Sequence, residues 1–151
     1  MVIPINQNNQ IIYLAFNLTN ICGFRVLELV SKDLSWMGTN KDVIVSCEDL
    51  LKEGVAQGCI LEVSQAQSNL NQCFPIVKRR SIISHHHIRD ATNPLWIQSP
   101  MCPKTHFTFS RPCDFNTFRF RLEDLVGDLF TIQFTHGVHL IIEFETIINF
   151  C

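Results

Sequence analysis

The stretch that decides the fold is FRFRLEDLVGDLFTIQFTHGVHLIIEFE, residues 118–145, in the last third of the chain. Apolar and polar side chains alternate with a period of two in 118–123, again in 130–134 and again in 138–145. Such alternation is typical of a β-strand with one buried face, and Gly127 and Gly137 stand where the chain would turn. The stretch therefore predicts three antiparallel strands joined by short turns.

The same period of two predicts further strands upstream. They cover residues 12–18, 24–30, 43–47 and 59–63. In the first of them the side chains expected to point inward are Ile12, Leu14, Phe16 and Leu18. Residues 24–30 are almost continuously apolar, as expected of a strand covered on both faces. Helix signals are weak, and only 47–53 is helix-like, as either a single helical turn or a loop.

About eight short strands with weak helix signals define an all-β class. We expect an antiparallel single jelly-roll sandwich of about eight strands with long connecting loops, forming one domain over residues 1–151. The middle of the chain, 65–104, is rich in Ser, Asn, Gln and Pro and is predicted to form long loops. A chain of 151 residues is long enough for one domain of this kind and too short for two.

The composition indicates that the molecule has a large apolar surface, which must be buried in a core or against neighbouring chains. Hydrophobic residues make up 46% of the chain and charged residues only 17%, with twelve Phe against one Tyr. The net charge of −2 excludes a generally basic nucleic-acid binder. Charge is segregated along the chain, because 78–121 is strongly basic and 122–151 is acidic. These two sections either neutralise each other or present complementary faces to neighbouring chains.

The seven cysteines indicate folding in a reducing compartment. Their number is odd, their spacing is irregular and the N-terminus has no secretory signal, so we expect buried free thiols rather than a disulfide framework. No apolar run approaches the length of a membrane span, so we expect no transmembrane helix.

The run His85-His86-His87 is the main candidate for a metal site. Consecutive residues of a strand point to opposite faces, so this run supplies two ligands at most on one side, and zinc needs three or four. A small cupin-like barrel would complete the site with His136 or His139. The Gly-rich frame and spaced Glu of such a site are absent, so we expect a solvated loop or a cluster at a subunit contact, where assembly would depend on pH near 6.

Other motifs give no catalytic chemistry. Lys78-Arg79-Arg80 lacks the interleaved aromatic residues of a nucleic-acid platform, and we expect it to lie in a solvated loop. No Cys-x-x-Cys spacing, phosphate-binding glycine loop or nucleophile elbow occurs. We therefore expect no enzyme activity, no catalytic residues and no cofactor.

Three segments resemble the single jelly-roll capsid proteins, pentons and minor capsid proteins, of large eukaryotic double-stranded DNA viruses and related elements. They are Asn93 to Ile97, Phe115 to Leu122 with the turn at Gly127, and Phe134 to Phe144. Upstream, Val43-Ile44-Val45-Ser46-Cys47-Glu48-Asp49-Leu50 is similar to another strand of that family. The likeness covers residues 43–145.

The resemblance implies a structural subunit of a virion, made in the host cytoplasm and acting by assembly. Its partners would be other capsid proteins, namely a major capsid protein and copies of itself, with no small-molecule substrate, no nucleic acid and no membrane span. Two alternatives remain open. One is the cupin-like metal-binding barrel that uses His85 and His87, and the other is a cytosolic module whose basic segment, Lys78 to Arg121, binds an acidic partner.

Overall fold

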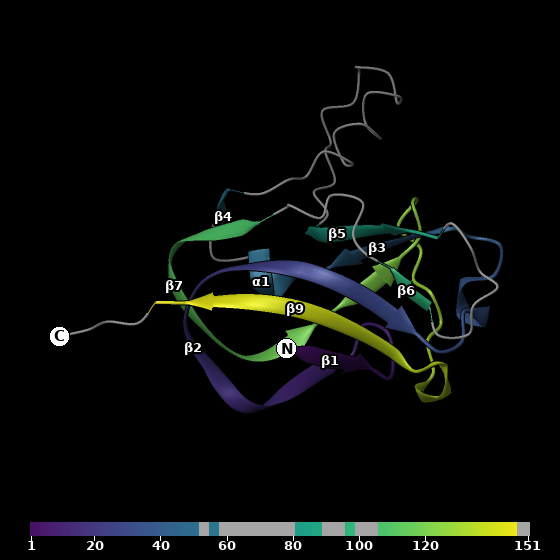
Figure 1. Ribbon diagram of the computed structural model, residues 1–151, viewed down its shortest axis with the longest axis horizontal. Coiled ribbons are helices and arrows are strands. Elements are labelled where there is room, and N and C mark those ends of the chain that lie inside the picture. Colours follow the sequence, from purple (N-terminus) through teal and green to yellow (C-terminus); the bar gives the residue numbers. More distant parts are fainter. Residues whose placement is uncertain (52–54, 58–80, 89–95, 99–105, 148–151) are drawn as a thin grey trace, which may run out of the picture.

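The computed structural model describes residues 1–51, 55–57, 81–88, 96–98 and 106–147 (Figure 1). Its strands are β1 (Val2–Ile5), β2 (Ile11–Ser31), β3 (Asp42–Ser46), β4 (Val55–Gln57), β5 (Ile82–His87), β6 (Trp96–Gln98), β7 (Phe107–Arg119), β8 (Arg121–Glu123) and β9 (Val138–Thr146). Its helical turns are η1 (Ser35–Met37), α1 (Glu48–Leu51) and η2 (Phe134–His136). Within these residues, no helix is long and apolar enough to cross a membrane.

The strands form two antiparallel sheets, which confirms the prediction of a mainly antiparallel β fold. The larger sheet has the order β1-β9-β2-β7-β4, with β6 also paired to β2. The smaller sheet has the order β5-β3-β8. In Figure 1, β5 and β3 lie along the upper side, and β1 and β9 run below them.

Apolar side chains from both sheets meet in one core. Ile3 and Leu140 reach it from the larger sheet, and Val43, Val45 and Leu122 reach it from the smaller one. Among the residues that the structure describes, seven Phe side chains are buried in this core: Phe24, Phe107, Phe109, Phe115, Phe118, Phe120 and Phe130. The high Phe content therefore fills the space between the sheets, where an aromatic ring buries a large area without a polar group to satisfy.

The alternation predicts the burial over 118–123 and 138–145, but 118–123 is not one strand, because it is divided between the end of β7 in the larger sheet and β8 in the smaller one. Phe118, Phe120 and Leu122 are buried, and Val138 and Leu140 are buried on the next strand. A turn of 124–128 follows β8, in which the side chain of Asp124 accepts hydrogen bonds from two backbone N–H groups.

The predicted strand over 130–134 is wrong. Phe130 and Ile132 are buried as its alternation requires, but the backbone forms only an isolated bridge between Leu129 and Glu123 before the helical turn η2. Two buried side chains at a spacing of two residues need only an extended backbone, and they do not require a neighbouring strand.

The long strand β2 contains two of the predicted strands, 12–18 and 24–30, and the burial in both differs from the prediction. Pairing with β9 shifts register between Val26 and Glu28, and Leu27 is 37% exposed, so 24–30 is not covered on both faces. Pairing with β7 shifts between Tyr13 and Leu18, and Phe16, expected to point inward, is 65% exposed.

The expectation of long loops over 65–104 is wrong where the structure describes that range, because β5 and β6 lie in it. The helical turn predicted over 47–53 is found as α1. The predicted strand 59–63 and the basic run 78–80 lie outside the described residues.

Candidate functional site

The smaller sheet has an outer face that is separate from the main core. Val43 and Val45 belong to the core, whereas Ile44, between them, forms a second buried cluster with Ile82. In the pairing of β3 with β5, His85 lies opposite Ile44 and His87 lies opposite Asp42. Both histidines therefore lie on this outer face, and they are not in a loop as the sequence led us to expect.

The two histidine rings reach the same carboxylate oxygen. Nε2 of His85 is 2.8 Å and Nδ1 of His87 is 2.9 Å from Oδ1 of Asp42. A carboxylate oxygen only accepts hydrogen bonds, so each ring donates an N–H to it. Partial burial raises the pKa of Asp42, but the hydrogen bonds from His87 and His85 and the charges of these rings outweigh it, and this pKa lies below its ordinary value of 3.8.

The lowered pKa of Asp42 predicts a pH-dependent stability difference between the wild type and Asp42→Asn. A depressed carboxylate pKa contributes stability above 3.8, and this contribution is lost as the pH falls through the folded-state pKa. Because the carboxylate is partly exposed, the cost of Asp42→Asn at pH 6 is expected to be about 1 kcal/mol or less. Urea unfolding at a series of pH values measures it, with Asp128→Asn, on an exposed side chain, as the matched control. A difference that persists unchanged at pH 2 would contradict this role of Asp42.

His86 points to the opposite face and is a core residue. It is fully buried, lies opposite Val43, and its Nε2 is hydrogen-bonded with Oγ of Ser84 at 2.9 Å. A buried imidazole with a polar partner is a structural feature of the core.

The structure does not bring together the ligands of the cupin-like alternative. His136 lies in η2, where its Nδ1 accepts a hydrogen bond from the backbone of Gln133, and His139 lies on β9 in the larger sheet. His85 and His87 lie on the smaller sheet. Among the described residues, no group of three or more His, Cys, Asp or Glu side chains is arranged to hold a metal ion.

The outer face continues into a charged cluster at β8. Glu123 is 4% exposed, and its Oε1 lies 3.0 Å from Nε of Arg121 and accepts a hydrogen bond from Oγ of Ser46 at 3.3 Å. This ion pair joins the basic section of the chain to the acidic one. Arg25 and Glu143 form a further ion pair at 2.9 Å. Self-neutralisation, one of the two readings of the segregated charge, is seen in the Arg121–Glu123 pair, whereas Arg25 lies outside the basic section 78–121.

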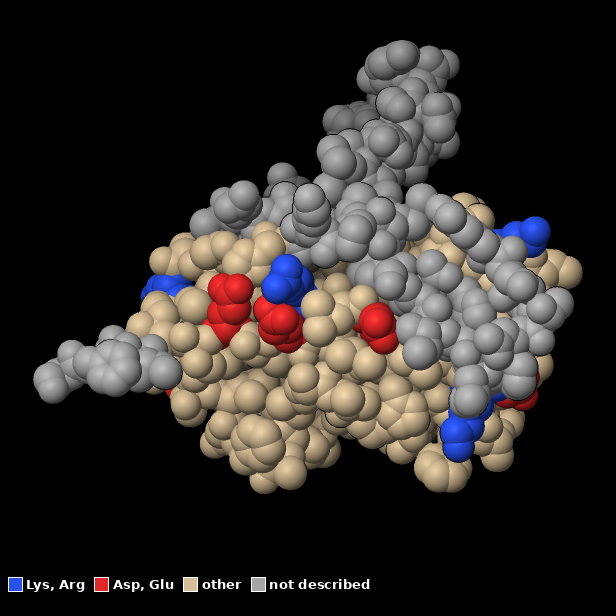
Figure 2. Space-filling view, in the orientation of Figure 1, with Lys and Arg blue, Asp and Glu red and all other residues tan. Residues whose placement is uncertain are grey.

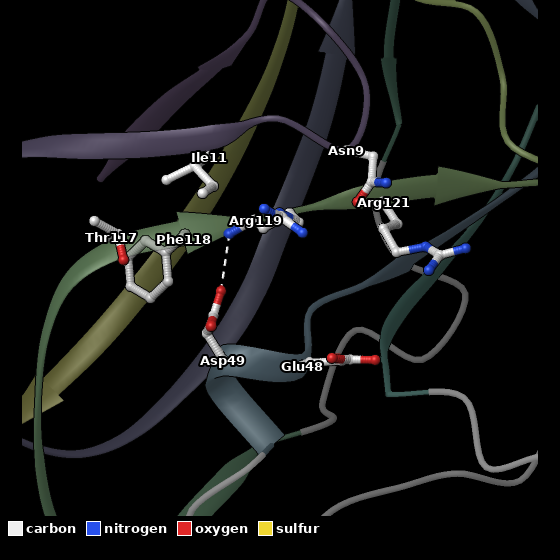
Figure 3. A pocket seen from close by; sticks show the side chains of 8 residues that line it. All are labelled: Asn9, Ile11, Glu48, Asp49, Thr117, Phe118, Arg119 and Arg121. Atoms are coloured by element: carbon white, nitrogen blue, oxygen red, sulfur yellow. Dashed lines mark hydrogen bonds between the residues drawn. The ribbon is translucent and has the colours of Figure 1, made fainter.

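A cavity of about 230 Å³ lies beside this cluster, between α1 and the strands β2 and β7 (Figure 3). It is lined by Asn9, Ile11, Glu48, Asp49, Thr117, Phe118, Arg119 and Arg121. Oδ2 of Asp49 accepts a hydrogen bond of 2.9 Å from the backbone N–H of Arg119, which fastens α1 to β7. The remaining charges are of both signs, so the cavity favours no single charged ligand.

The cysteines that the structure describes agree with the expected free thiols. Cys47 and Cys113 are buried, Cys22 is partly exposed, and all three are free. Burial raises the pKa of Cys47 to about 12, so this thiol stays protonated and is a poor nucleophile. Cys59, Cys73, Cys102 and Cys151 lie outside the described residues.

Exposed apolar side chains are the feature that the sequence pattern missed. Tyr13 and Phe16 are 78% and 65% exposed on β2, and Val126 and Phe134 are 82% and 75% exposed between β8 and β9. Alternation alone carries no signal for this, because Phe16 and Phe134 both continue an apolar face in the sequence. In Figure 2 most of the charged side chains lie across the middle of the visible surface, and the lower left part, over the first half of β2, carries none.

Comparisons with protein-family models, curated proteins and solved structures find no match to this chain.

Proposed function

We propose that this chain is a structural subunit of a viral capsid, a penton or minor capsid protein that acts by assembly with neighbouring capsid subunits. It would be made in the host cytoplasm and incorporated into the virion. The proposal rests on the sequence resemblance, on the arrangement of the strands and on the exposed apolar surface. Its partners would be copies of itself and a major capsid protein.

The arrangement of the strands supports a single jelly roll. The second half of β2 pairs with β9 and with the start of β7, and β9 pairs with β1. The first half of β2 pairs with the end of β7, and β8 follows β7 directly in the chain. Strand β3 pairs with β8 on one side and with β5 on the other. If β2 and β7 are each counted as two strands, β8 is counted with the end of β7 and the short strands β4 and β6 are left aside, these pairings give two four-stranded antiparallel layers, as in an eight-stranded jelly roll.

The observation that carries the proposal is the exposed apolar surface beside a complete core. Main-core residues such as Phe118 and Leu140 are fully buried, and yet Tyr13, Phe16 and Phe134 are mostly exposed. Tyr13 and Phe16 lie on the same strand, β2, whereas Phe134 lies in η2, and large apolar side chains exposed in this way favour an interaction surface. A subunit that contacts several neighbours in an assembly has such a surface on more than one side.

Quantitative mass spectrometry of purified virus particles tests this function. We expect the chain at a fixed copy number relative to the major capsid protein, unchanged after high-salt and detergent washing of the particles. A host cytosolic protein of similar abundance serves as the control for adhering material. Absence of the chain from washed particles, or a copy number that falls with each wash as the control does, would contradict the proposal.

A further inference from the structure

Strand β1 is an edge strand of the larger sheet. It pairs with β9 on one side, and in the part of the chain that the structure describes no strand pairs with its other side (Figure 1). Val2 is 60% exposed and Pro4 is exposed, whereas Ile3 and Ile5 are buried in the core. An open edge of this kind carries backbone N–H and C=O groups that can pair with a strand of another molecule.

The hydrogen bonds at the start of β1 show which backbone groups face the open side. The backbone N–H of Ile142 donates to the carbonyl oxygen of Met1 at 2.9 Å, and the amino group of Met1 donates to the carbonyl oxygen of Ile142 at 2.7 Å. In an antiparallel ladder, residues that exchange both bonds with the partner strand alternate with residues whose N–H and C=O groups point away from it. The regular register of β1 on β9 therefore turns the backbone groups of Val2 and Pro4 to the open side.

Pro4 lies at one of these two positions and brings no backbone N–H to the edge. Its ring also occupies space that the backbone of an incoming strand would need, which is why proline is compatible with an edge strand and unfavourable in a paired one. Within β1, Val2 is then the one residue that offers an N–H to the open side. An incoming strand would find one donor on β1 where an ordinary sequence would present two.

Apart from its short length, β1 lacks the other features that usually protect a strand edge. Residues 1–24 contain no Asp, Glu, Lys or Arg, so β1 carries no charged side chain. Its pairing with β9 has no register shift, so no bulge twists the edge away. The other residues of β1 are Val and Ile, which favour a strand. The protection of this edge therefore depends on Pro4.

We propose that Pro4 keeps the open edge of β1 from pairing with a strand of a second molecule. The inference goes beyond the proposed function, because it concerns the chain itself, whatever assembly the chain joins. It also limits how subunits meet in such an assembly. Their contacts are made by side chains, and not by a sheet that continues from β1 into a neighbouring molecule.

Replacing Pro4 with valine tests the proposal, because Pro4→Val restores the missing N–H and keeps an apolar side chain. We expect the variant to self-associate at roughly tenfold lower concentration than the wild type, since each copy gains a ladder donor. Sedimentation velocity over a concentration series measures this change, and circular dichroism verifies folding. In NMR hydrogen exchange with isotope-labelled valine, the N–H introduced at position 4 should become protected as the protein concentration rises.

Two further variants separate the backbone from the side chain. Pro4→Thr introduces the same N–H with a polar side chain, and it should associate as Pro4→Val does. The double variant Val2→Pro with Pro4→Val is the matched control, because it moves the proline to the other position that faces the open side. The double variant should sediment as the wild type does.

Three results would overturn the proposal. The first is that Pro4→Val and Pro4→Thr sediment as the wild type does. The second is that the double variant associates as strongly as Pro4→Val, because the contact then does not run along β1. The third is an associated Pro4→Val chain in which the N–H at position 4 still exchanges freely. None of these results bears on whether the chain is present in virus particles, so the capsid function is tested separately.

Discussion

Replacing Phe118 with alanine is expected to lower the free energy of unfolding by about 3–5 kcal/mol. Phe118 is fully buried, and its ring lies 5.4 Å from that of Phe115, 5.6 Å from that of Phe120 and 5.7 Å from that of Phe144, between ring centroids. The substitution removes apolar contact and leaves a cavity between β7 and β9. Since a domain of this size is stable by about 5–15 kcal/mol, this one change takes a large share of the total.

Urea unfolding followed by tryptophan fluorescence measures the loss, and Phe16→Ala is the matched control. Phe16 is 65% exposed, so its truncation should change stability of the isolated chain by no more than about 0.5 kcal/mol. Equal losses for the two variants would mean that Phe118 is not at the centre of the core.

Replacing Gly23 with alanine has the second largest expected effect, a loss of about 1–3 kcal/mol from steric overlap. A Cβ at this position would lie 2.7 Å from the carbonyl oxygen of Phe107 and 3.1 Å from Nε2 of His106. The nearer atom belongs to the backbone of the paired strand β7, so it cannot rotate away. A shift of Phe107 also disturbs the stacked rings of Phe24 and Phe107, whose centroids lie 4.8 Å apart.

The usual gain from removing a flexible glycine, about 0.5–1 kcal/mol, opposes this effect and is smaller than it. Thermal unfolding of Gly23→Ala measures the net change. Gly137→Asn is the comparison, because Gly137 has a left-handed backbone with φ +62° that Asn tolerates, and its close neighbour is the flexible side chain of Lys32. Gly23→Ala as stable as the wild type would show that β2 and β7 are farther apart than the structure places them.

The sequence predicts a strand correctly where the alternation of apolar and polar residues coincides with a regular pairing to the neighbouring strands. Over 138–145 every second side chain is apolar, and the strand pairs with β1 over 138–141 and with β2 over 139–146, so period and structure coincide. The pattern fails where the ladder is irregular. Phe16 and Leu27 lie within register shifts of β2 and are exposed, and a sequence contains no local mark of such a bulge.

The candidate sites were harder to predict because they depend on pairing between distant segments. The contact of Asp42 with His85 and His87 follows from the register of β3 on β5, which joins residues more than 40 positions apart. The histidine run itself is easily noticed in the sequence. Its placement in a strand could not be predicted, since the run lies in a polar stretch of the chain. The cavity of about 560 Å³ is lined by residues 6–8 and 129–134, and no periodicity relates these two segments.

The most direct test of the capsid function is a density map of the virus particle from electron cryo-microscopy. We predict density for a subunit of two packed antiparallel sheets at symmetry-related positions in the protein shell, into which the sheet β1-β9-β2-β7-β4 and the sheet β5-β3-β8 fit, with Tyr13 and Phe16 against a neighbouring subunit. A shell whose density is accounted for completely by other proteins, with no position that this chain fits, would contradict the account.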